Sequence, residues 1–184
     1  MAQDTIKCYD TPSDVVAALA EDFIAFTNEE ISRTETCIVG ITGGTVINGL
    51  LETLNSPECI ERVNWERIFF VWTDERFLPQ SHEDNYFNRV KPYLLCKAKG
   101  AAHFFPINTN SKTVIEAADE YEKEIGNVLK ACKKSGLDLA ILDLGEDGHT
   151  AGLFAGSHAL RVADRNVVPV EDGKVWERIS MTFS

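Results

Sequence analysis

The chain has 184 residues, of which 44% are hydrophobic and 26% are charged; this length and composition suit one globular domain with a full apolar core and exclude wholesale disorder. The formal net charge of −11 disfavours nucleic acid and anionic membranes as partners. A small anionic substrate stays compatible with this charge, because a few local cations outweigh a distant, screened negative field.

Helices and strands are predicted to alternate along most of the chain. The first helix is predicted at 13–26, where Ser13 can cap its N-terminus. Continuous apolar runs predict buried strands at 37–41 and 67–72, with a helix at 45–54 between them. The later elements, in order, are a helix at 85–95 with a break or kink at Pro92, a short strand at 102–107, a helix at 113–136, and strands at 138–145, 166–170 and 178–183.

The helix at 113–136 carries the clearest end signals. Thr113 and Glu116 have the spacing of a capping box. Lys133 and Lys134 suit the negative end of the helix dipole, and Gly136 suits the stop.

The predicted strands are continuously apolar rather than alternating, which is typical of parallel strands buried on both faces. We therefore predict an α/β fold, with a single domain over 1–184 and a mostly parallel sheet that has helices on both faces. Ligands of such sheets bind beyond the carboxyl ends of the strands. Three polar turns follow predicted strands there: "TGGT" (42–45), "TDERF" (73–77) and "GEDGHT" (145–150).

The first two turns each allow a functional and a structural interpretation. Gly43 and Gly44 open a helix, whose free N–H groups can bind phosphate or stabilise an oxyanion; the alternative is a simple tight turn. Asp74, Glu75 and Arg76 follow an aromatic strand. The guanidinium of Arg76 offers a planar fork for phosphate or carboxylate, and the alternative is a solvated charge cluster.

His149 in the third turn is bracketed by Gly145 and Gly148 and is predicted to project over the sheet edge. An imidazole can accept and return a proton near neutral pH, and Asp147 is close enough to hold its tautomer. The alternative is an exposed turn histidine. No metal site is predicted, because no ligand spacing relates the remaining histidines, His82, His103 and His158.

Taken together and in this order, the three turns resemble those of the 6-phosphogluconolactonase family, part of the glucosamine-6-phosphate isomerase/6-phosphogluconolactonase superfamily. The segments that carry the resemblance are Gly43-Gly44, "WTDERFLP" with "DNY" shortly after, "LGEDGHTAGLF", and "RISMT" near the end. The resemblance runs over nearly the whole chain. It implies a Rossmann-like α/β fold of the type that these lactonases share with glucosamine-6-phosphate deaminases.

The resemblance also implies an activity, the hydrolysis of 6-phospho-D-glucono-1,5-lactone to 6-phosphogluconate in the oxidative pentose phosphate pathway. No metal or organic cofactor is required, and the expected partner is a small phosphosugar lactone. His149 would transfer the protons, with Asp147 beside it. The residues expected to bind substrate and phosphate are Gly43, Gly44, Thr45, Asp74, Arg76 and Arg178.

Two alternatives compete with the lactonase interpretation. A glucosamine-6-phosphate deaminase-like isomerase usually has tyrosine in place of Arg76 and a glutamate where this chain has Phe154. A non-catalytic sugar-phosphate-binding module is the second alternative. Measuring lactone hydrolysis against its uncatalysed background separates the binder from the enzyme.

The chain departs from the family pattern after the glycine pair, at Gly152 and Ala155, where serine and proline are common, and at its end. Thr45-Val46-Ile47 stands where many members have serine-threonine-proline. The chain also stops at Ser184, before the further helix, strand and glycine-x-x-lysine segment of the family. We therefore expect a C-terminally truncated domain, in which the strand at 178–183 lacks a covering helix and promotes self-association.

The sequence predicts a cytoplasmic location. The first ten residues carry acids and no apolar core, so no signal peptide is expected, and no apolar run approaches the length of a membrane span. The cysteines are odd in number and lack CxxC spacing, which fits a reducing compartment: Cys8, Cys37, Cys59, Cys96 and Cys132.

Overall fold

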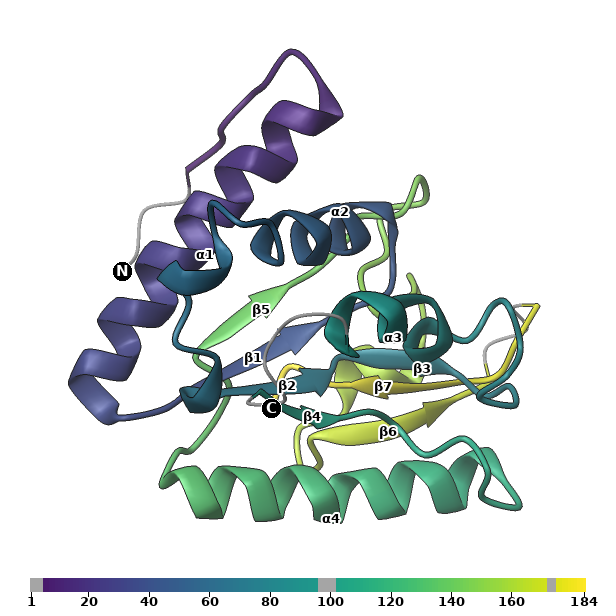
Figure 1. Cartoon of the computed structure of the whole chain (residues 1–184). Helices are drawn as coiled ribbons and strands as arrows, with labels where there is room; N and C mark the ends of the chain where they lie inside the picture. The colour runs from purple at the N-terminus through teal and green to yellow at the C-terminus, as the bar shows by residue number, and fades with distance from the viewer. Residues whose placement is uncertain (1–4, 96–101, 172–174) are drawn as a thin grey trace.

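The computed structural model describes residues 5–95, 102–171 and 175–184, in which helices and strands alternate as predicted (Figure 1). The helices are α1 (Pro12–Thr34), α2 (Thr45–Leu54), α3 (Tyr86–Leu95) and α4 (Val114–Cys132), with short 3-10 helices η1 (Ile60–Arg62), η2 (Trp65–Arg67) and η3 (His158–Arg161). The strands are β1 (Cys37–Ile41), β2 (Ile68–Trp72), β3 (Asp74–Arg76), β4 (His103–Phe105), β5 (Leu139–Ile141), β6 (Val167–Val170) and β7 (Arg178–Met181).

The main sheet consists of four parallel strands in the order β4-β2-β1-β5. Every residue of β1 is buried, as expected for a continuously apolar central strand. Helix α4 lies on one side of the strands, and α1 and α2 lie on the other (Figure 1). These observations confirm the predicted α/β fold with a mostly parallel sheet and helices on both faces.

A second, antiparallel sheet was not predicted. In it β7 lies between β3 and β6, with Arg76 opposite Arg178 and Asp74 opposite Ser180. Ile179 and Ser180 are fully buried, and α4 packs against both β6 and β7. The expectation that the last strand lies uncovered is therefore wrong, because β7 is the middle strand of this sheet. Self-association through the C-terminal region stays a prediction.

Several helix ends differ from the expected ones. α1 is capped by Thr11 rather than Ser13. The Thr11 side chain accepts a hydrogen bond from the backbone N–H of Asp14, and the Asp14 carboxylate accepts one from the backbone N–H of Thr11. α3 continues through Pro92, close to its end. α4 ends at Cys132, and Lys133, with φ of 56°, takes the left-handed position expected for Gly136.

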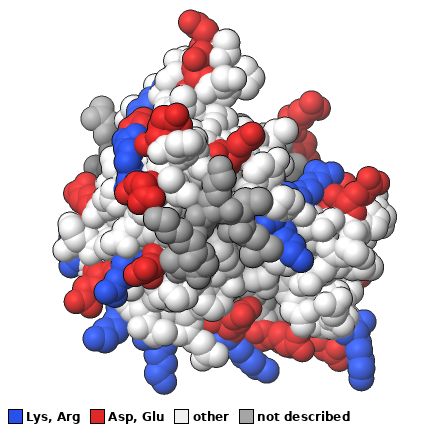
Figure 2. All heavy atoms as spheres, in the orientation of Figure 1, with Lys and Arg blue, Asp and Glu red and all other residues white. Residues whose placement is uncertain are grey.

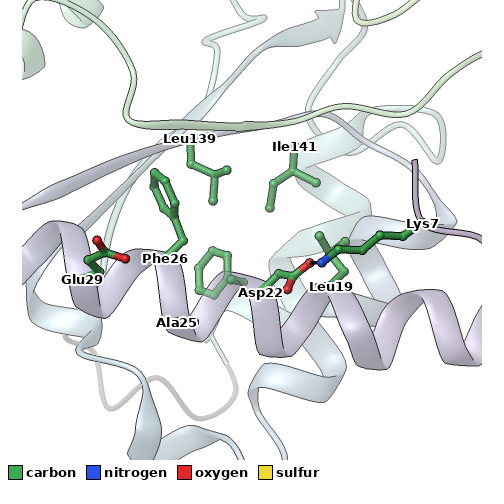
Figure 3. A pocket seen from close by; sticks show the side chains of 9 residues that line it. Lys7, Leu19, Asp22, Ala25, Phe26, Glu29, Leu139 and Ile141 are labelled. Atoms are coloured by element: carbon green, nitrogen blue, oxygen red, sulfur yellow. Dashed lines mark hydrogen bonds and ion pairs between the residues drawn. The ribbon is translucent and has the colours of Figure 1, made fainter. Parts of the chain in front are cut away.

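β5 is an edge strand and is shorter than the predicted strand at 138–145. Between β5 and α1 lies an apolar groove, into which Leu139, Ile141 and Phe26 point (Figure 3). Past the strand, the side chain of Leu144 is 79% exposed. Exposed apolar surface is thus found beside β5, at the opposite edge of the main sheet from β4.

The described part of the chain contains no helix that is long and apolar enough to cross a membrane. On the face shown in Figure 2, basic side chains are interspersed among acidic ones. Cys8, Cys37, Cys59 and Cys132 are free thiols, while Cys96 lies outside the described residues. Burial raises the pKa of Cys37 to about 12, so this thiol is unreactive.

Candidate active site

The three polar turns meet because β1 pairs with both β2 and β5 in the same direction. The Thr42 hydroxyl donates to Asp74 Oδ1 at 2.6 Å, which joins the first turn to the second. The Thr42 N–H donates to the carbonyl of Ile141 at 3.4 Å, which joins the first turn to the segment that leads into the third. The site therefore lies at the carboxyl ends of the parallel strands, where ligands of such sheets bind.

Side chains pack closely against the glycine turn. A Cβ on Gly43 would lie 1.9 Å from the Tyr86 ring, and a Cβ on Gly44 would lie 1.7 Å from Asp143 Oδ2. Gly44 is the N-cap of α2 and Thr45 its first residue, and no side chain caps this helix start. The first N–H groups of α2 are therefore available to an anion or to a developing oxyanion.

Asp74 and Arg178 form a buried ion pair. Arg178 Nη1 donates to Asp74 Oδ2 at 2.9 Å, and the two side chains are 12% and 1% exposed. Burial raises the pKa of Asp74, and the Arg178 guanidinium and the Thr42 hydroxyl oppose this rise. Asp74 thus orients Arg178, because a guanidinium held by a buried carboxylate has little freedom to move.

Arg76 and Arg178 face each other across the antiparallel pair of β3 and β7. Like charges placed directly opposite one another repel. Each arginine also has a buried Nε donor without a hydrogen-bond partner. Arg76 is held by Asp84, with Nη1 at 3.0 Å from Oδ1. Two facing cations with spare donors form a site that an anion would complete.

Glu75, to which the sequence analysis assigns no role, anchors the start of α3. Its fully buried carboxylate accepts from the N–H groups of Arg76, Tyr86 and Phe87 at 2.8, 2.9 and 2.9 Å. Burial raises the pKa of Glu75 to about 7, and the three N–H donors oppose the rise. Glu75 thereby fixes Tyr86 relative to β3 and its Arg76.

His149 is the candidate acid–base group of the site. Its Nδ1 is hydrogen-bonded to Asp147 Oδ1, and its backbone N–H donates to the same oxygen at 3.3 Å. Because an ionised carboxylate only accepts, this contact places the proton on Nδ1 and leaves Nε2 to act as a base. The ring packs 4.5 Å from Phe154, whose ring lies 5.3 Å from the Arg178 guanidinium carbon.

Asp143 is a carboxylate that the sequence analysis missed. It is half-buried, and its Oδ2 lies against Gly44. Burial, and next the charge of Asp74, raise the pKa of Asp143. The sequence assigned residue 143 to a continuous strand, whereas β5 ends at Ile141. The acid that interrupts the apolar run "LAILDLG" was the available signal.

The described residues contain no group of three or more His, Cys, Asp or Glu side chains arranged to hold a metal ion. The glycine turn is instead flanked by the ring of Tyr86 and by the carboxylates of Asp74 and Asp143. A histidine paired with an acid lies beside two facing arginines. The class is therefore an α/β protein with a candidate site at the carboxyl ends of its parallel strands.

Residues 10–184 match the family model for glucosamine-6-phosphate isomerases/6-phosphogluconolactonase, and the chain belongs to this family. It is 28% identical over 189 residues to 6-phosphogluconolactonase 3, chloroplastic, of Arabidopsis thaliana, covering 97% of this chain and 58% of the relative. It is 28% identical over 182 residues to the 6-phosphogluconolactonase of Rhizobium meliloti, and this match covers 96% of this chain and 75% of the relative. The chain thus spans less than two thirds of the Arabidopsis protein.

The fold is similar to that in the crystal structure of a 6-phosphogluconolactonase from Shewanella baltica. The TM-score is 0.82 at 21% identity, and the match covers 95% of this chain and 72% of the other. This likeness, together with the family match, confirms the resemblance on which the sequence analysis relied.

Proposed function

We propose that this protein hydrolyses 6-phospho-D-glucono-1,5-lactone to 6-phospho-D-gluconate, the lactonase step of the oxidative pentose phosphate pathway. One arrangement carries the proposal. His149, paired with an acid, packs against the ring of Phe154, and Arg178 lies against the same ring. Arg178 in turn faces Arg76 across the β3–β7 pair. The names of the Arabidopsis and Rhizobium relatives support it.

In the proposed reaction, His149 Nε2 takes a proton from water as the water oxygen attacks the lactone carbonyl carbon. The resulting oxyanion collapses, the bond from the carbonyl carbon to the ring oxygen breaks, and the imidazolium returns its proton to that oxygen. Asp147 holds the ring tautomer and stabilises the imidazolium. The products are a free hydroxyl group and a carboxylic acid, which loses its proton to water.

Arg76 and Arg178 bind the substrate phosphate in this proposal. Their spare Nε donors and facing charges suit a dianion, which would relieve the repulsion between them. Asp74 positions Arg178 rather than acting as the base. The N–H groups at Gly43, Gly44 and Thr45, at the start of α2, bind an anionic oxygen of the substrate. This oxygen belongs either to the phosphate or to the oxyanion formed at the carbonyl carbon.

The deaminase alternative is disfavoured by what lies beside His149. Phe154 contacts the imidazole at the position where a deaminase would have its glutamate, so this side chain supplies no acid for ring opening. Arg76 likewise replaces the expected tyrosine. The proposed chemistry uses no metal or organic cofactor, and we place it in the cytoplasm because the cysteine pattern fits a reducing compartment.

The test is lactone hydrolysis measured by acid release or by NMR, with the uncatalysed rate subtracted. The protein is expected to accelerate hydrolysis, and a His149→Gln variant is expected to lose that acceleration while still binding 6-phosphogluconate. A protein that binds 6-phosphogluconate but gives only the background rate would be the sugar-phosphate-binding module. Ammonia release from glucosamine 6-phosphate would support the deaminase.

A further inference from the structure

Tyr86 contacts three of the residues predicted to bind substrate. Its hydroxyl accepts from Arg178 Nη1 at 3.3 Å, and the Arg76 guanidinium carbon lies 4.7 Å from the centre of its ring. Its ring also fills the space beside Gly43, 1.9 Å from where a Cβ would stand. Tyr86 is the last residue of the "DNY" segment.

These contacts address the repulsion between the two facing arginines. A guanidinium over the face of a tyrosine ring is attracted by the negative face of the ring, while a phenolic oxygen accepts a hydrogen bond from a second guanidinium. Tyr86 therefore offers each cation a different partner. Without the phenol, Arg76 would keep its contact with Asp84 and Arg178 its contact with Asp74, but no side chain would bridge the two cations as Tyr86 does.

The position of Tyr86 is itself fixed. It is 8% exposed, and its backbone N–H donates to the buried carboxylate of Glu75 at 2.9 Å. Because Gly43 has no side chain, the ring packs directly on the glycine turn. The same ring thus touches the start of α2 and both arginines, so its position determines how the turn and the arginines are spaced.

We propose that Tyr86 is a positioning residue that spaces Arg76 and Arg178 from each other and from the glycine turn, so that the arginines bind the substrate phosphate as a pair. This inference rests on the proposed lactonase function for its substrate, although the spacing of the arginines is measurable without any substrate. Tyr86 transfers no proton and contacts no reacting atom in this role, so it acts on substrate affinity rather than on turnover.

Two Tyr86 variants separate the ring from the hydroxyl. Tyr86→Phe keeps the ring and loses the hydrogen bond to Arg178, so KM for the lactone should rise about threefold to tenfold. Tyr86→Leu loses both contacts, so KM should rise about tenfold to a hundredfold while kcat stays within about twofold. The dissociation constant of 6-phosphogluconate should rise in parallel with KM.

Two control variants exclude indirect effects. Phe87→Leu disturbs the packing of α3 on Trp72 without touching either arginine, and Tyr9→Phe removes a hydroxyl at an exposed position far along the chain. Both should leave KM unchanged. A Phe87→Leu variant that raises KM as much as Tyr86→Leu would overturn the proposal, since general loosening of α3 would then explain the effect.

A substrate-free measurement keeps this inference separate from the proposed activity. In ¹H–¹⁵N spectra of the arginine side chains, the Tyr86 ring should shift the Nε–H resonance of Arg76. This ring-induced shift should be retained in Tyr86→Phe and should disappear in Tyr86→Leu. If the wild-type protein neither hydrolyses the lactone nor binds 6-phosphogluconate, the proposed function fails. If it does both, and Tyr86→Leu changes neither KM nor the Arg76 resonance, the positioning role fails.

Discussion

The ring of Phe154 lies 4.5 Å from the imidazole of His149, with the two planes tilted by 34°. An apolar ring therefore covers one side of the predicted base, at the position where a deaminase would present a carboxylate. Since Phe154 also lies 5.3 Å from the Arg178 guanidinium carbon, it separates the proton-transfer group from the predicted phosphate ligand.

Phe154→Glu should shift the rise of kcat/KM to higher pH. A carboxylate beside the imidazole favours the protonated ring, so a higher pH is needed to free His149 as a base. Phe154→Gln is the matched control, with similar size and no charge, and should leave the profile in place. The check is a pH–rate profile of all three proteins. An unshifted profile in Phe154→Glu would show that His149 is not the titrating base.

His149→Gln should lower kcat by about a hundredfold or more, because general acid–base catalysis typically contributes this much. The affinity for 6-phosphogluconate should change little, since the imidazole does not hold the phosphate. His158→Gln, at an exposed position in η3, is the control and should retain full activity. Retention of half the wild-type kcat in His149→Gln would rule out the assigned base.

Arg76→Ala and Arg178→Ala should both raise KM but should differ in stability. Arg178→Ala leaves the fully buried Asp74 without its counter-ion, which should lower the free energy of unfolding by about 3–5 kcal/mol. Arg76 pairs with the partly exposed Asp84, so its loss should cost about 1 kcal/mol or less. Urea denaturation of both variants measures the difference.

A second substitution tests the origin of that instability. Adding Asp74→Asn to Arg178→Ala removes the uncompensated charge, so part of the lost stability should return while KM stays high. Equal stability losses in the two single arginine variants would contradict the assigned ion pair.

Glu30→Gln should destabilise the protein at neutral pH and much less in acid. Lys134, which donates to Glu30 at 2.7 Å, is the main cause that lowers the pKa of Glu30 from 4.5 to about 2. A lowered folded-state pKa adds stability above pH 4.5 that is lost as pH falls toward 2. The stability difference between wild type and variant should therefore shrink from about 3 kcal/mol to near zero over this range.

Unfolding by urea at several pH values measures this difference. Glu29→Gln, one position away and exposed, is the control and should follow the wild type at every pH. A constant difference between Glu30→Gln and wild type from neutral to acid pH would contradict the assignment.

Asp143→Asn should strengthen the binding of 6-phosphogluconate by about threefold to tenfold at neutral pH, because it removes a negative charge beside Gly44. The gain should diminish in acid, where the wild-type Asp143 becomes protonated; its pKa is already raised by burial and by Asp74. Isothermal titration measures both effects. Asp164→Asn, at an exposed position, is the control. Weaker binding in Asp143→Asn would instead show that this carboxylate helps to hold the ligand.

The sequence was sufficient for the main sheet and for the convergence of the three turns. Apolar runs such as "CIVGI" predict a parallel strand directly, and the strand order then brings their carboxyl ends together. The helix caps were less predictable, because Thr11 and Ser13 both carry a hydroxyl near the start of α1. Only the path of the backbone determines that Thr11 pairs with Asp14.

The second sheet and the facing arginines were not predictable from local pattern. "DER" has no apolar alternation and therefore predicts a turn, whereas its pairing with "RISM" depends on long-range register. That register places Arg76 opposite Arg178, whereas the sequence showed only two separate cations. Tyr86 and Asp143 were missed for a related reason, since their contacts with the glycine turn arise from packing between distant segments.

The pairing of Asp74 with Arg178 spans 104 positions of the chain. A ribosome therefore completes β1, β2 and the buried acid long before it supplies the cation that neutralises this acid. Until β7 has emerged, closing the interior around Asp74 carries the full desolvation penalty of an unpaired carboxylate. The nascent chain thus has an electrostatic reason to keep this end of the sheet open until Arg178 is available, so the candidate site closes only after β7 has emerged.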